Sequence, residues 1–161
     1  MKPVKIAILS LTHGHTRKYF QTLNDNPNLD GVAVTADTEE VRDVFYHYGY
    51  NQIPCYMSDE EMFDAHPEIE AVVIASANSR HLEQVKACAR RGIHILSMKI
   101  PTFDMKEYDE MMHVVKDAGI VCQVELEMHY NPVVCRMKKL FAEKALGDVK
   151  AFNATNITLS P

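Results

Sequence analysis

Short apolar runs alternate with amphipathic segments along the chain. Continuous runs of β-branched and aliphatic residues are typical of strands buried on both faces, whereas apolar residues at helical spacing indicate helices. The predicted strands are residues 4–9, 29–34, 54–56, 71–75, 93–97 and 120–124. The predicted helices are residues 17–23, 39–48, 82–91, 104–116 and 133–142, with a further helix opening at the capping box of residues 58–61. This alternation across short loops predicts an α/β fold with a doubly wound parallel sheet.

The segment after the first strand, residues 10–16, is a short polar turn with one glycine. In a parallel sheet such a turn lies at the carboxyl end of its strand, where the next helix presents unpaired N–H groups and the positive end of its dipole. The usual occupant of this place is a pyrophosphate. The candidate cofactor contacts in the turn are Ser10, Thr12, His13, Gly14 and His15.

The turn departs from the glycine pattern of dinucleotide-binding proteins. The places that hold glycine in that pattern are occupied by Ser10, Thr12 and His15, and Gly14 is out of register. Either the loop is one residue longer and Gly14 supplies the permissive backbone, or the turn binds nucleotide poorly. An ordinary connection without a ligand explains this turn equally well.

An acidic residue, Asp37, follows the second strand. This is the place where a dinucleotide fold holds the hydroxyls of the adenosine ribose, so Asp37 is the ribose candidate. A carboxylate here repels a 2′-phosphate, which favours NAD over NADP as the cofactor. Asp37 can also cap the next helix, and the two roles are compatible.

Charge and length narrow the class of protein. The chain has 161 residues and a net charge of −5, with no run of Lys and Arg, which argues against nucleic acid or an anionic membrane as a partner. No apolar run approaches the length of a membrane span, and Met1-Lys2-Pro3 leads directly into a strand without a signal peptide. We therefore expect one domain of ordinary size in the cytoplasm.

The cysteines and histidines give no metal-binding pattern. Cys-x-x-Cys spacing is absent among Cys55, Cys88, Cys122 and Cys135, which favours free thiols. Cys88 and Cys122 fall in apolar patterns and are expected to be buried. The pair His13-x-His15 could offer two nitrogens to a metal, but no Cys or carboxylate at ligand spacing accompanies it, so we expect no metal.

A series of short motifs resembles the Gfo/Idh/MocA family of oxidoreductases, named for glucose-fructose oxidoreductase and inositol dehydrogenase. In chain order they are Ser76-Ala77-Asn78 with His81, then Gly92, His94-Ile95-Leu96 and Lys99, then Ala118-Gly119-Ile120-Val121, His129-Tyr130-Asn131-Pro132 and Leu146-Gly147-Asp148-Val149. The resemblance covers essentially the whole chain. It implies a Rossmann-like domain that binds NAD or NADP, with Ser76, Asn78 and His81 among the cofactor contacts.

The resemblance also assigns the catalytic candidate, Lys99. In the family the matching lysine lies by the nicotinamide and the substrate hydroxyl, where a cation can hold the substrate oxygen and tune an acid–base group. Lys99 therefore counts as a catalytic, cofactor and substrate residue. The family usually has glutamate before this lysine and proline after it, whereas this chain has Met98 and Ile100. A solvated lysine after a strand is the alternative interpretation.

The last part of the chain resembles the entry into a second, α+β domain. In related proteins the turn around His129 faces the cleft, so Glu125, Glu127 and His129 are candidate substrate neighbours, with a solvated loop as the alternative. Residues 150–159 alternate as a strand, and the resemblance makes it the first strand of the domain that carries the acid–base histidine. We expect a dinucleotide-binding domain at 1–124 and a truncated second domain at 125–161, with the lone strand disordered, folded back or paired with another copy in a homo-oligomer.

The resemblance implies the cofactor domain of an NAD(P)-dependent oxidoreductase. The whole protein would transfer hydride between the nicotinamide and a carbinol carbon of a sugar or polyol, and the chain alone would be inactive. A non-catalytic nucleotide sensor or interaction module is the alternative, which the missing glycines, Met98 and Ile100 favour. A fold without any ligand is the third possibility.

Overall fold

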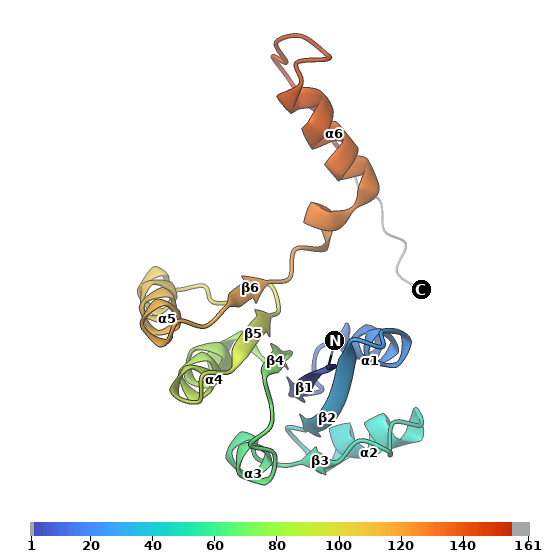
Figure 1. Cartoon of the computed structure of the whole chain (residues 1–161), viewed down its shortest axis with the longest axis vertical. Helices are drawn as coiled ribbons and strands as arrows, with labels where there is room; N and C mark the ends of the chain where they lie inside the picture. Colours follow the sequence, from blue (N-terminus) through green and yellow to red (C-terminus); the bar gives the residue numbers. More distant parts are fainter. Residues whose placement is uncertain (1, 156–161) are drawn as a thin grey trace. The chain divides into compact units, whose positions relative to one another are not determined.

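The computed structural model describes residues 2–155 and confirms a Rossmann-like α/β fold. Six parallel strands form one sheet in the order β3-β2-β1-β4-β5-β6 (Figure 1). They are β1 (Val4–Leu9), β2 (Leu29–Thr35), β3 (Cys55–Tyr56), β4 (Ala71–Ile74), β5 (His94–Ser97) and β6 (Cys122–Val124). The helices between them are α1 (Thr16–Asp25), α2 (Glu39–His47), α3 (Asp59–Ala65), α4 (Asn78–Arg90) and α5 (Met105–Ala118).

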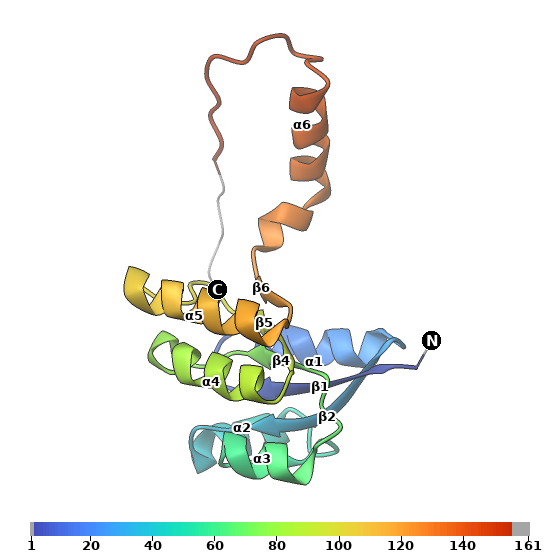
Figure 2. The ribbon, with the colours of Figure 1, turned by 60° about the vertical axis from the view of Figure 1, so that its left-hand side comes forward.

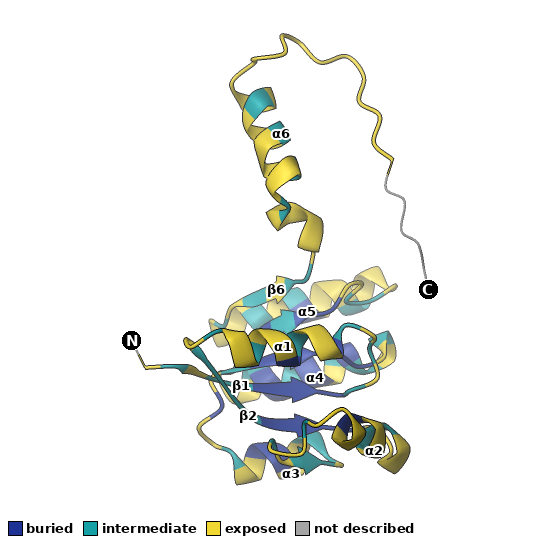
Figure 3. Ribbon diagram, turned by 90° about the vertical axis from the view of Figure 1, so that its right-hand side faces the viewer, coloured by how far each residue is buried: buried dark blue, intermediate teal, exposed yellow. Residues whose placement is uncertain are grey.

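Helices cover both faces of the sheet, with α1 and α2 on one face and α3, α4 and α5 on the other (Figure 1). Successive side chains of a strand point to opposite faces, so each central strand contributes to two cores. On β1, Ile8 belongs to the core that contains Phe20 of α1 and Phe45 of α2, whereas Leu9 belongs to the core under α3, α4 and α5. The last three residues of β1, β2 and β4 are therefore buried between exposed helix surfaces, whereas the edge strands β3 and β6 are at most partly buried (Figure 3).

Helix α4 begins four residues earlier than the sequence pattern indicates, at Asn78 and not at Leu82. Ala77 precedes it without a side-chain cap, and the backbone N–H of Arg80 donates to the Ala77 carbonyl over 2.9 Å. Polar residues such as Asn78 at this helix start usually favour turns. Here they form the first turn of a helix, which places Arg80 and His81 beside the ends of the strands.

The chain divides into two compact units, Met1–Glu125 and Leu126–Pro161. The second unit contains the short 3-10 helix η1 (Glu127–Tyr130) and helix α6 (Pro132–Ala142), which follow β6 along the chain (Figure 2). Asn131 caps α6, as its pairing with a proline predicts, because its Oδ1 accepts from the next backbone N–H groups. The assignment of residues 125–161 to a truncated substrate domain stays a prediction.

The expected strand at residues 150–159 does not form in its described part. Residues 150–155 have no regular secondary structure, and residues 156–159 lie outside the described residues. A strand needs a neighbour to pair its backbone groups, and the six-stranded sheet of the described residues does not include this segment. The alternating pattern alone was therefore insufficient to predict a strand.

All four cysteines are free thiols, as predicted. Cys88 is fully buried, and burial raises its pKa to about 12. Burial likewise raises the pKa of the partly buried Cys55 thiol to about 11. Cys122 is only partly buried, and Cys135 is exposed. Protonated thiols of this kind are poor nucleophiles, which fits a structural role for Cys55 and Cys88.

Across residues 2–155, every helix is too short or too polar to cross a membrane.

Candidate functional site

The carboxyl ends of β1, β2, β4 and β5 meet at one edge of the sheet. Strand β1 pairs with β2 on one side and with β4 on the other, so the chain connections diverge at this point. Ligands of open parallel sheets bind at such a topological switch point. The residues that directly follow these strands include Ser10, Ala36-Asp37, Ala75-Ser76 and Met98-Lys99. The fold therefore brings the candidates from four segments to one edge.

Ser10 adopts the permissive backbone conformation that the sequence suggested for Gly14. Its φ is +71°, in the left-handed region, and its side chain is fully buried. The φ of Gly14 lies outside that region, so the suggestion that Gly14 supplies the permissive backbone is wrong. Ser10 stands at the first glycine position of the dinucleotide pattern, where the chain makes its tight turn. The turn keeps the glycine conformation at this position without the glycine.

Asp37, the ribose candidate, accepts hydrogen bonds from three side chains. The hydroxyls of Ser10 and Thr12 both donate to its Oδ2, and the guanidinium of Arg80 donates to its Oδ1. Thr38, and not Asp37, caps α2, because the Thr38 side chain accepts from Val41 N. Asp37 therefore contributes its carboxylate to the sheet edge and not to the helix end.

Arg80 also binds a second carboxylate, that of Asp59 at the start of α3. Its Nη2 donates to Asp59 Oδ2 over 2.9 Å, and Gln84 Nε2 donates to the same oxygen over 2.8 Å. The Thr35 hydroxyl donates to Asp59 Oδ1 over 2.7 Å. We call Ser10, Thr12, Asp37, Asp59 and Arg80 the carboxylate cluster. It joins four segments of the unit through side chains alone.

The histidines of the first turn stabilise the loop itself. The backbone N–H of His13 donates to the Ala75 carbonyl over 3.2 Å, and that of His15 donates to His13 Nδ1 over 3.1 Å. Burial, and next the nearby His15, lower the pKa of His13, so its ring is neutral at pH 7. His15 Nδ1 lies 3.4 Å from Glu125 Oε2 at the end of β6. Within the loop, the backbone N–H groups of Thr12, His15 and Thr16 already donate to Ser10 Oγ, His13 Nδ1 and the His13 carbonyl.

The loop that carries Lys99, residues 98–101, is held mainly through its backbone. Asn78 Nδ2 donates to the Ile100 carbonyl, and His81 Nδ1 lies 2.9 Å from the Pro101 carbonyl. The other ring nitrogen of His81 lies 3.1 Å from the Ser76 carbonyl. Asn78 and His81, which the resemblance identifies as cofactor contacts, therefore hold the Lys99 loop against the end of β4.

Lys99 itself is exposed, and its charge contributes to lowering the pKa of His13. Met98, at the position of the family's acid, is fully buried in the core on the α1 side. Its sulfur accepts a hydrogen bond from the Tyr19 hydroxyl. An ionised glutamate in that apolar position would need a charged partner, so Met98 in this chain is part of the core.

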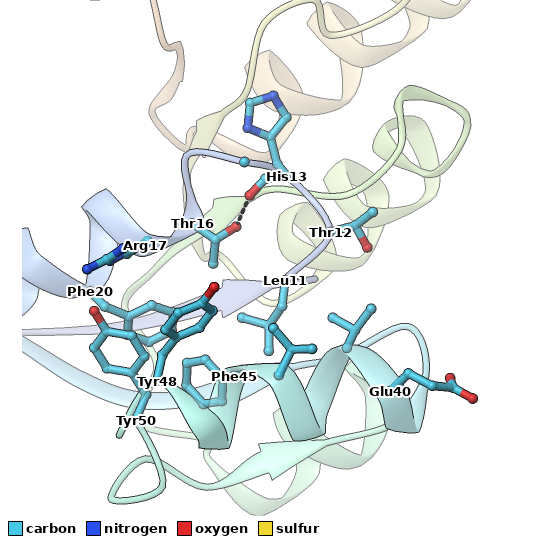
Figure 4. Close-up of a pocket in the computed structure, with 13 residues that line it drawn as sticks. Leu11, Thr12, His13, Thr16, Arg17, Phe20, Glu40, Phe45, Tyr48 and Tyr50 are labelled. Carbon is cyan, nitrogen blue, oxygen red and sulfur yellow. Dashed lines mark hydrogen bonds between the residues drawn. The ribbon is translucent and has the colours of Figure 1, made fainter. Parts of the chain in front are cut away.

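An apolar cavity of about 440 Å³ lies between α1 and α2, and residues 11–14 of the first turn form part of its wall (Figure 4). Its aromatic wall contains Phe20, Phe45 and Tyr50, with ring centroids 4.7 to 5.3 Å apart. Arg17 lies over the Tyr48 ring at 5.5 Å. Neither Asp37 nor Arg80 lines this cavity. Thr12 of the carboxylate cluster does line the cavity, so the cavity and the cluster adjoin at the first turn.

The remaining candidates lie apart from this edge in the chain. Glu127 and His129 belong to η1 in the second unit, and both are exposed. Their proposed role as substrate neighbours stays a prediction. Residues 2–155 contain no group of three or more His, Cys, Asp or Glu side chains arranged to hold a metal ion.

Sequence reasoning missed Arg80, Asp59 and Gln84. Arg80 lies 43 residues from Asp37 and 21 residues from Asp59, so no local spacing connects them. The position of Arg80 could have been predicted from the sequence. Arg80 follows the central strand β4 within six residues, which places it near the carboxyl ends of the strands. Asp59 gave only the signal of a helix start.

Comparison with known proteins agrees with the fold. Residues 6–126 match the family model described as the oxidoreductase family with an NAD-binding Rossmann fold. The uncharacterized oxidoreductase YfiI of Bacillus subtilis is 26% identical over 134 residues, which are 80% of this chain and 34% of that protein. Levoglucosan dehydrogenase of Pseudarthrobacter phenanthrenivorans is 35% identical over 89 residues, which are 55% of this chain and 23% of the enzyme.

A solved structure shows the same architecture. The crystal structure of myo-inositol 2-dehydrogenase from Lactobacillus plantarum superposes with a TM-score of 0.82 at 21% identity, over 92% of this chain and 43% of that one. The chain thus spans about a third or less of these curated relatives, and less than half of the solved enzyme. Because the family model covers most of the chain, this protein belongs to the Gfo/Idh/MocA oxidoreductase family through its NAD-binding Rossmann-fold domain.

Proposed function

We propose that this chain is the cofactor domain of an oxidoreductase that transfers hydride between a nicotinamide dinucleotide and a carbinol carbon of a sugar or polyol. The observation that carries the proposal is the position of Asp37, at the end of β2 and next to the tight turn after β1. In a dinucleotide fold this is where a carboxylate accepts the ribose hydroxyls and the turn receives the pyrophosphate. The name of the relative that is 35% identical, levoglucosan dehydrogenase, supports a carbohydrate substrate.

Different residues at the carboxyl edge of the sheet bind different parts of the cofactor and the substrate. Asp37 orients the adenosine ribose, and the turn of residues 10–16 with the start of α1 holds the pyrophosphate. The nicotinamide, when bound, accepts or returns the hydride. Lys99 reaches the substrate hydroxyl from the end of β5, where its positive charge stabilises the oxygen as the proton leaves. The group that takes that proton is proposed to lie outside these 161 residues, so the chain alone binds cofactor without turnover.

Titration calorimetry of this chain with NAD, NADH and NADPH tests the proposal. We expect saturable binding of NAD and NADH. Asp37→Ala should weaken NAD binding about ten- to hundredfold, since hydrogen bonds to a charged group are lost. NADP binding should not weaken, because the carboxylate that repels the 2′-phosphate is removed. Asp43→Ala, which removes an exposed acid of α2, is the matched control and should change neither affinity. Absence of NAD binding at millimolar concentration contradicts the proposal.

A non-catalytic nucleotide sensor is the second candidate, and the burial of Met98 favours it. The family's acid beside the lysine is replaced here by a core residue. Hydride transfer by the whole protein separates the two candidates. A protein that binds NAD but reduces it with none of a panel of sugars and polyols is a sensor.

A further inference from the structure

Three donors converge on one carboxylate at the end of β2. The hydroxyls of Ser10 and Thr12 approach Asp37 Oδ2 from the first turn, and the guanidinium of Arg80 approaches Oδ1 from α4. Convergent hydroxyl and guanidinium donors are the groups that bind phosphate oxygens in proteins. Within the chain, Asp37 therefore occupies an anion site of the kind that a phosphate could otherwise use.

A second carboxylate holds Arg80 independently of Asp37. Asp59, whose side chain is 14% exposed, binds the second nitrogen of the guanidinium. Asp59 is itself held by the Thr35 hydroxyl and the Gln84 amide. Because these contacts do not involve Asp37, its removal leaves Arg80 aimed at the same position.

We propose that Arg80 is the positioning residue that makes this site select NAD over NADP, by holding Asp37 as an internal anion where a 2′-phosphate would otherwise bind. The inference rests on the proposed function, since it concerns the same cofactor. Two carboxylates share the single charge of Arg80, so the cluster keeps a net charge of −1 and repels a further anion. A ribose 2′-hydroxyl can donate to Asp37, whereas a 2′-phosphate can only accept.

The proposal gives Arg80 opposite roles with and without Asp37. In the native chain Arg80 neutralises and orients Asp37, so it supports binding of NAD. Once Asp37 is replaced by a neutral residue, the same guanidinium and the two hydroxyls face an empty anion site. Arg80 then supports binding of NADP.

The test is a double-mutant cycle read by calorimetry with NAD and NADP. Asp37→Ser should weaken NAD about tenfold or more and strengthen NADP about tenfold. Adding Arg80→Met to Asp37→Ser should abolish the NADP gain. Arg80→Met alone should weaken NAD two- to tenfold and weaken NADP further, whereas Arg80→Lys should restore much of the NAD binding. Arg42→Met and Asp43→Ser, which alter the partly buried arginine and the exposed acid of an ion pair on α2, serve as matched controls and should change neither affinity.

The outcomes distinguish the inference from the function on which it rests. If the native chain binds NAD and Asp37→Ser gains NADP equally with and without the added Arg80→Met substitution, the inference is overturned and the proposed function stands. If the native chain binds neither dinucleotide, the proposed function fails. The affinity of Asp37→Ser for 2′,5′-ADP, which lacks the nicotinamide half, then decides the inference alone: Arg80-dependent binding supports it, and no binding overturns it.

Discussion

The carboxylate cluster and the Lys99 loop lie along the same edge of the sheet, but they are held in different ways. Side chains fix the cluster, since Asp37 and Asp59 accept from hydroxyls, an amide and a guanidinium. The Lys99 loop is held by its backbone carbonyls, which Asn78 and His81 contact. The identity of each cluster residue is therefore constrained, as is that of Met98, whose side chain is buried in the core. Ile100 is exposed and is held through its carbonyl, which explains how it can replace the usual proline after Lys99 without loss of the loop.

The largest effect should come from the acid that anchors the cluster. Asp59→Ala leaves the buried Thr35 hydroxyl and Gln84 amide without this acceptor, and it removes one of the two carboxylates that Arg80 binds. We expect the free energy of unfolding to fall by roughly 2–4 kcal/mol, measured by urea denaturation. Glu61→Ala, an exposed acid in the same first turn of α3, should cost less than about 0.5 kcal/mol. Equal losses in the two variants would show that Asp59 contributes no more to stability than an exposed acid does.

An intermediate effect should appear at the Lys99 loop as a dependence on pH. Burial lowers the pKa of His81 from its ordinary value of 6.5, so the unfolded chain takes up a proton more readily than the folded chain. The stability due to neutral His81 is complete above pH 6.5 and is lost as the pH falls towards the lowered pKa. We expect a loss of up to about 1.4 kcal/mol for each pH unit in that window.

The measurement is urea denaturation between about pH 7.5 and pH 5. His81→Gln should flatten the plot of unfolding free energy against pH below pH 6.5. The comparison is His13→Gln, which removes a histidine of the first turn whose pKa is also lowered. A profile that keeps its full slope in His81→Gln contradicts the assignment.

The smallest effect should distinguish the contribution of the Ser10 backbone conformation to stability from that of its hydroxyl. Ser10→Ala and Ser10→Gly both lose the bonds to Asp37 and Thr12, but only glycine relieves a φ of +71°. The glycine variant should therefore be the more stable of the two by about 1 kcal/mol in thermal unfolding. At the exposed helical residue Ser79 the order should reverse, with alanine about 1 kcal/mol better.

The sheet was predictable because its signals are local. The apolar runs at residues 4–9 and 71–75 contain enough β-branched and aliphatic residues to indicate central strands on their own. The start of α4 was missed because Asn78 forms a side-chain bond to Ile100, far away in the sequence, instead of ending a turn. The strand expected at residues 150–159 was overestimated because alternation indicates a strand only where a partner is present.

The site was predictable only residue by residue. The positions of Asp37 and Lys99 at the carboxyl ends of their strands could be predicted from the sequence, whereas their roles stay predictions. The partners of Asp37 could not, because Arg80 and Asp59 come to it from other helices through the order of the strands. The positive φ of Ser10 could not be predicted either. A serine at a glycine position suggests a turn of another type, whereas Ser10 adopts the left-handed conformation that glycine has there.

The pairing of β1 with β4 has a consequence for folding. Ile6 pairs with Ala71, so the two halves of the sheet meet only after a long loop between them has closed, at a cost in chain entropy. Asp37 comes from the first half and Arg80 from the second. Within each half the strands pair with one another, and in the described sheet the pairing of β1 with β4 joins the halves. If the chain binds cofactor as proposed, recovery of binding during refolding should therefore report the joining of the two halves.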